Sequence, residues 1–178
     1  MPNNIRNQPM YWSSGAPQTE NVASLLYPGM LGTKATDVDK TDGFTKTHML
    51  VQSDSTMTVA PFDGATAWWS NRSSYLVTTS PTALGRGRVA GIFRMAVALG
   101  NFCAVQTQGR HATVKFVDAP TANPTAAGLI VIPSATAGKA DCLTAASAAT
   151  YPALGVSAGV YNAANATAAV DLDVPETL

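Results

Sequence analysis

The sequence has few ionised side chains. Lysine, arginine, aspartate and glutamate make up 12% of its 178 residues, with 11 basic and 11 acidic side chains and no formal net charge. An ordinary soluble domain carries about 25%. A surface with so few charges is poorly protected against association. We therefore expect a partner or copies of the chain to cover much of the surface of this protein. The alternative is a small domain wetted by Thr, Ser, Asn and Gln.

Other features are missing as well. The neutral total and the lack of lysine-rich runs argue against a nucleic-acid partner, because phosphate binding needs concentrated basic side chains. No run of about 18 apolar residues occurs, so no membrane span is expected. The first residues contain no apolar stretch of the signal-peptide type. We therefore expect synthesis in a reducing cytoplasm and no contact with a membrane.

Cysteine and histidine are scarce. The two cysteines, Cys103 and Cys142, are too few for a disulfide framework and stand in apolar contexts, so both are expected to be buried. With His48 and His111 they do not show the spacing of a zinc site. The sequence predicts no metal and no cofactor.

Composition separates an extended arm, residues 1–24, from a single β-rich domain, residues 25–178. The arm is rich in Asn, Pro, Ser and Gln, shows no helical period, and carries Tyr11 and Trp12 as candidate anchors. A free tail of this kind would be disordered. Two adjacent aromatic residues indicate instead that the arm lies on another surface.

The domain is expected to be all-β, as a small barrel or sandwich of short strands. Its N-terminal strands or insert cover residues 25–82, and the more regular core covers residues 83–178. Strands are predicted at 48–52, 55–60, 74–79, 87–100, 101–109, 111–117, 128–133 and 168–174. Alanine is abundant after residue 118, but proline and glycine interrupt nearly every helical window, which leaves only a short helical turn at 144–151.

The stretch GNFCAVQTQGRHATVKF, residues 100–116, is interpreted as two consecutive strands joined at Gly109. A turn at residues 99–101 would begin the hairpin. Cys103 alternates inward with Val105, whereas Arg110 and Lys115 would be displayed.

Catalytic patterns are weak, and we expect no enzyme. GVSAG around Ser157 fits the nucleophile motif of hydrolases, but no histidine follows it and no strand–helix alternation surrounds it. A Cys103–His111 pair would need the chain to fold back at Gly109. DVDKTDG, residues 37–43, departs from the calcium-loop spacing; a cation site on Asp37, Asp39 and Asp42 competes with a solvated turn at Asp42-Gly43.

Candidate interface residues come from two patterns. The stretch AWWSNR offers Trp68, Trp69 and Arg72, residue types that are frequent in interface hot spots, although tryptophan can equally be core. Residues 86–115 carry five basic and no acidic side chains: Arg86, Arg88, Arg94, Arg110 and Lys115. They would either pair with acidic residues that follow in the chain or form a basic face for an acidic partner.

Four stretches carry a family resemblance: LGRGRVAGIFRMAVALGNFCAVQTQGRHATVKF, AGLIVIPSATAGKADCL, ALGVSAGV and TAAVDLDV. The segment from about Leu84 to Val174 that contains them resembles decoration (cement) proteins of tailed-bacteriophage capsids. The small members of that family lack so long an arm and insert before the core.

The resemblance implies a structural virion protein on the outer capsid surface, made in the bacterial host. Its partners would be the major capsid protein and copies of itself, with a trimer favoured over a dimer. A phage tail-fibre or receptor-binding β-module is the alternative, and a small hydrolase using Ser157 or Cys103 is a third class. An active-site probe would label the hydrolase, and isolated receptor-binding modules would bind cells or glycans.

Removal of residues 1–24 is expected to weaken binding to the capsid and to leave the β-domain folded, because the arm holds contacts but no predicted core. Circular dichroism and cosedimentation with capsids measure the two effects. Unchanged capsid binding would contradict the proposed role of Tyr11 and Trp12.

Overall fold

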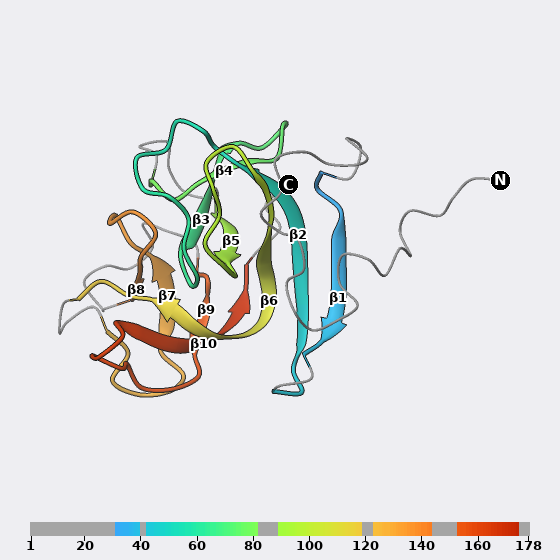
Figure 1. Cartoon of the computed structure of the whole chain (residues 1–178). Helices are drawn as coiled ribbons and strands as arrows, with labels where there is room; N and C mark the ends of the chain where they lie inside the picture. The colour runs from blue at the N-terminus through green and yellow to red at the C-terminus, as the bar shows by residue number, and fades with distance from the viewer. Residues whose placement is uncertain (1–30, 40–41, 82–88, 119–122, 144–152, 175–178) are drawn as a thin grey trace.

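The computed structural model of the chain describes residues 31–39, 42–81, 89–118, 123–143 and 153–174 (Figure 1). Every regular element within these ranges is a strand, which confirms the all-β prediction. The strands are β1 (Lys34–Val38), β2 (Thr45–Ser53), β3 (Thr66–Asn71), β4 (Leu76–Thr78), β5 (Val89–Phe93), β6 (Phe102–Lys115), β7 (Ile130–Pro133), β8 (Ala140–Cys142), β9 (Gly155–Ser157) and β10 (Thr167–Asp173). The expected arm and the helical turn at 144–151 lie outside the described residues.

Five strands close into a small barrel in the order β2–β4–β3–β5–β6, because β6 also pairs with β2. The β2–β4 pairing is parallel, and the other barrel pairings are antiparallel. Strands from both sides of residue 82 build this barrel. β1 extends the sheet beyond β2, and β10, β9, β7 and β8 extend it beyond β6.

The long strand β6 connects the barrel to these additional strands, and its curved path is visible in Figure 1. Residues 102–108 pair with β2, and residues 108–115 pair with β10. The prediction of two strands joined at Gly109 is wrong, because β6 is one strand of 14 residues that continues through this glycine. The predicted burial of Cys103 is confirmed, whereas Arg110 and Lys115 are only partly exposed.

Gly109 allows the strand to change direction without ending. Its φ of +84° is favourable only for glycine, and a Cβ atom would collide with the carbonyl oxygen of Thr45. The side-chain amide of Gln106 shares its N–H groups among the carbonyls of Gln108, Gly109 and Arg110, each at 3.1 Å. The polar backbone of the bend is therefore satisfied although Gln106 is buried.

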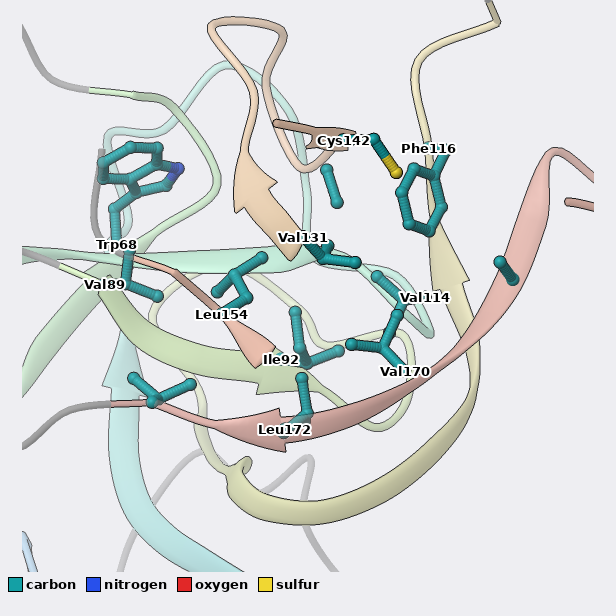
Figure 2. Packing of buried hydrophobic residues seen from close by; sticks show 13 residues of the cluster. Trp68, Val89, Ile92, Val114, Phe116, Val131, Cys142, Leu154, Val170 and Leu172 are labelled. Atoms are coloured by element: carbon teal, nitrogen blue, oxygen red, sulfur yellow. The ribbon is translucent and has the colours of Figure 1, made fainter. Parts of the chain in front are cut away.

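Buried apolar side chains form two clusters. The barrel cluster comes from the five barrel strands and their connections: Met49, Val51, Ala65, Ala67, Trp69, Val77, Ala90, Phe93, Val97, Cys103 and Val105. The sheet cluster lies between the outside of the barrel and strands β7 to β10: Trp68, Val89, Ile92, Val114, Phe116, Val131, Ala140, Cys142, Leu154, Ala168, Val170, Leu172 and Val174 (Figure 2). Cys142 lies near the ring of Phe116, so the prediction of a buried thiol is confirmed here too.

The alternating pattern of the last strand is also confirmed. Val170, Leu172 and Val174 are buried in the sheet cluster, whereas Ala169 and Asp171 are partly exposed. Predicted strands at 48–52 and 128–133 correspond to β2 and β7. The turn expected at residues 99–101 precedes β6, but the strand before it ends at Phe93, so the connection is longer than a tight hairpin.

The strand predicted at residues 55–60 is wrong. These residues form turns and bends, because the carboxylate of Asp54 accepts hydrogen bonds from the backbone and the hydroxyl of Thr56. Such local bonds compete with strand pairing. A further hydrogen bond from Ser70 to Asp54 fixes the turn against β3, and these bonds lower the pKa of Asp54, the one from Ser70 most of all.

We expect Gly109→Ala to lower the free energy of unfolding by at least about 2 kcal/mol, since it combines an unfavourable φ with a backbone collision. Gly43→Ala is the matched control, because Gly43 has a φ of +74° but no atom within 4 Å of the added methyl group. Its loss should stay near 1 kcal/mol, about the cost of the backbone conformation alone. Urea unfolding measures both, and equal losses would contradict the proposed close approach to Thr45.

Candidate protein-interaction surface

A row of side chains crosses four strands on one face of the extended sheet. Ile130 of β7 lies opposite Val156 of β9, and Val156 lies opposite Asp171 of β10. Asp171 in turn lies opposite Arg110 of β6. Side chains of directly paired residues project from the same face of a sheet, so these four lie side by side.

This row faces away from the core. Val131, Val170 and Leu172, which neighbour the row in sequence, belong to the sheet cluster on the opposite face. Phe44 extends the row, because the guanidinium of Arg110 lies 4.2 Å from the centre of its ring. We call Phe44, Arg110, Asp171, Val156 and Ile130 the outer row.

The outer row is apolar at both ends. The exposed fractions of Phe44, Val156 and Ile130 are 39%, 41% and 44%, which is high for large apolar residues in or beside strands. At its centre, Arg110 Nε and Nη2 donate to the two carboxylate oxygens of Asp171 at 2.8 and 3.0 Å. This double hydrogen bond raises the pKa of Arg110. The row therefore offers apolar contacts and an ion pair that carries no net charge.

The arginines of the described residues do not form a common basic face. Arg110 is paired with Asp171, as the alternative of internal pairing predicted. Arg94 is half-buried, and its charge acts on His48 and His111. Arg72 is exposed and lines a cavity with Lys34. The remaining candidates Arg86, Arg88, Tyr11 and Trp12 lie outside the described residues.

The two tryptophans are core residues. Trp68 is 1% exposed in the sheet cluster and Trp69 is 6% exposed in the barrel cluster, because adjacent residues of β3 point to opposite faces and both faces are covered. The prediction that they form a surface hot spot is therefore wrong for this chain by itself. Of the three candidates in that stretch, Arg72 is the exposed one.

Two of the three candidate aspartates of the acidic loop pair with a lysine, whereas Asp37 Oδ1 lies 3.5 Å from His48 Nδ1. Lys46 Nζ lies 2.7 Å from carboxylate oxygens of both Asp39 and Asp42. The amide of Gly43 donates to the carbonyl of Asp39, as expected for a turn between β1 and β2. Among the described residues, no group of three or more potential ligands is arranged to hold a metal ion.

Ser157 and Cys103 occupy structural positions. Ser157 is the last residue of β9 and is buried; its hydroxyl donates to the carbonyl of Ala126 and accepts from the amide of Leu129. It therefore holds the segment before β7 and does not stand on the strand-to-helix turn that a nucleophile motif requires. Cys103 is fully buried in the barrel cluster.

The histidines form a buried polar region that sequence reasoning missed. His48 is fully buried on β2 opposite Gln106, and His111 is buried on β6 opposite Val170. Burial above all lowers the pKa of His48 to about 3 and of His111 to about 4, and the positive charges of Arg94 and Lys46 add to this effect. Asp63 partly opposes it at His111. The only sequence signal for this buried region was that each histidine lies in a predicted strand.

The chain matches no protein-family model, no curated protein and no solved structure. Within the described ranges, the fold also contains no helix able to cross a membrane. The likeness to decoration proteins therefore rests on the sequence alone.

Stability is expected to fall as the pH drops from about 6.5 toward 4. In that range the unfolded chain protonates both histidines while the folded chain keeps them neutral, so acid favours unfolding. Each histidine should reduce the free energy of unfolding by about 1.4 kcal/mol per pH unit. Urea unfolding at pH 7, 6 and 5 measures the loss, and His48→Gln should remove part of it if the variant folds.

An independent readout does not depend on that variant. The imidazole resonances of the folded protein should remain those of neutral rings down to about pH 5. Titration of both rings near pH 6.5 in the folded state would contradict the proposed burial of neutral histidines.

Proposed function

We propose that the chain is a structural virion protein that binds the outer surface of a phage capsid and stabilises the lattice by bridging capsid subunits. The observation that carries this proposal is the outer row, an exposed apolar sheet face with a neutralised ion pair at its centre. A protein with only 12% charged residues gains from covering such a face. The resemblance to decoration proteins suggests that the partner is the major capsid protein.

The chemistry of the outer row suits a protein partner. Interface cores are depleted in charged residues other than arginine and enriched in aromatic residues, and the outer row contains both Phe44 and Arg110. Arg110 is already held by Asp171 and by the ring of Phe44, so little side-chain freedom remains to be lost on binding. Val156 and Ile130 lie on strands, which present them at fixed positions.

Stabilisation follows from preference for the assembled shell. A protein that binds two neighbouring capsid subunits better than separate ones shifts the equilibrium toward the lattice. Because the same contact repeats over the shell, modest individual affinities become collectively strong. Self-association, with a trimer favoured, would bring several outer rows to one location and increase this effect.

Val156→Asn is expected to weaken binding to shells of the encoding phage by about tenfold or more, since burial of a valine side chain contributes about 1.5–3 kcal/mol. Purified protein is added to shells assembled without it, and cosedimentation and the disruption temperature of the shells are measured. The wild-type chain should bind and raise that temperature.

Leu99→Asn is the matched control, because Leu99 is a comparably exposed apolar residue in the turn before β6, whereas Arg110 lies in the second half of that strand. It should bind like the wild type. Failure of the wild-type chain to bind or protect the shells would overturn the proposed function. Equal binding by Val156→Asn would instead reject the outer row as the contact surface.

A further inference from the structure

The order of side chains in the outer row is complementary to the same order reversed. From the β6 side the row runs from Phe44 through Arg110 and Asp171 to Val156, which is apolar, positive, negative, apolar. In the opposite direction it runs apolar, negative, positive, apolar. A second copy of the chain, turned end for end, therefore presents an acid to the arginine and an apolar residue to each apolar residue.

The central ion pair has hydrogen-bonding capacity to spare. A guanidinium has more N–H groups than one carboxylate can accept, and Asp171 accepts from Nε and Nη2 of Arg110. Both side chains remain partly open to solvent, with exposed fractions of 33% for Arg110 and 42% for Asp171. Asp42 also acts on Arg110, but its carboxylate lies 2.7 Å from Lys46 Nζ. Arg110 can therefore donate to a further carboxylate that approaches from outside the sheet.

Apolar surface lies on both sides of this ion pair. Val156 lies beside Asp171 on the neighbouring strand, and the ring of Phe44 lies against the guanidinium of Arg110. Both apolar residues are exposed. Removing them from water together would supply affinity between two copies, whereas the charges would decide how the copies are aligned.

Two arrangements bring the outer rows of two copies face to face about a two-fold axis. An axis that crosses the strands would set every residue against its own counterpart, and like charges in direct opposition repel. An axis that runs along the strands, between β6 and β10, would set Arg110 against Asp171 of the second copy and Phe44 against Val156. Because β6 and β10 are neighbours in the sheet (Figure 1), this axis lies over the ion pair. The charges therefore select the second arrangement.

We propose that the free protein is a two-fold dimer in which the outer rows of two copies face each other in this reversed order. Each Arg110 then lies between two carboxylates, and each Asp171 between two guanidinium groups. The same face cannot contact a shell and a second copy at once, so the dimer has to open on the capsid, and the trimer favoured there would use other surfaces. The dimer goes beyond the proposed function and does not depend on it.

Sedimentation equilibrium of the full chain at pH 7, over a wide range of concentrations, should show a monomer–dimer equilibrium. Asp171→Arg leaves two positive charges in the row, and Arg110→Asp leaves two negative charges. Each variant alone should dimerise at least about tenfold more weakly, because like charges then face each other. A wild-type chain that stays monomeric, even if it binds shells, would overturn the proposal.

An equimolar mixture of these two variants separates contact between copies from damage within one chain. Both variants break the internal ion pair, but in the mixture the two positive charges of one face the two negative charges of the other. The mixture should therefore associate at least about tenfold more tightly than either variant alone. A mixture that associates no better than its components would overturn the proposed alignment. Thermal unfolding of each variant verifies that it is folded.

Val156→Asn keeps the ion pair and should also weaken the dimer, which keeps the proposal testable if a charge variant fails to fold. Lys139→Asp is the matched control for the change in net charge, because Lys139 also lies over an aromatic ring, that of Phe62, but is not part of the outer row. It should dimerise like the wild type. Equal weakening in this control would overturn the proposal, as would unchanged dimerisation of Val156→Asn. Since no shells are present, these outcomes are independent of the proposed function.

Discussion

The bend of β6 at Gly109 is the constraint on which the rest of the structure depends. Residues before it close the barrel against β2, and residues after it carry the sheet toward β10. A side chain at Gly109 would collide with Thr45, and without the amide of Gln106 three carbonyls near the bend would lose a buried donor. One strand can therefore belong to both clusters of core residues, and the two parts fold around a shared element.

The candidate interaction surface follows from this arrangement. The outer row exists because the register from β6 through β10 and β9 to β7 aligns Arg110, Asp171, Val156 and Ile130 on the face opposite the sheet cluster. A shift of one residue in this register would turn these four side chains toward the core and expose their buried neighbours.

The correct predictions concern features that are determined by nearby residues in the sequence. The alternation in residues 168–174 and the apolar run at 128–133 correctly predicted strands, and the apolar residues around both cysteines correctly predicted that the thiols are buried. The parallel β2–β4 pairing depends on contacts distant in sequence, so no local pattern predicts it. Strand propensity failed at residues 55–60 because Asp54 satisfies that backbone locally. Because Trp68 and Trp69 are adjacent in a strand, their side chains point to opposite faces, and the sequence suggested that one of them is exposed. Both are buried because each face of β3 is covered by a different cluster.

Pairing between charged side chains further reduces the net charge that the surface presents. Arg110 is neutralised by Asp171, and Lys46 lies between Asp39 and Asp42, so several of the few ionised groups already act on each other. Internal pairing is therefore compatible with coverage by a partner, but it lowers the net charge of the surface without explaining the low content of ionised residues. Such a surface has little long-range field with which to steer a partner. Under the proposed function, association would depend on short-range apolar contact and shape, and repetition on the lattice would strengthen the weak individual contacts.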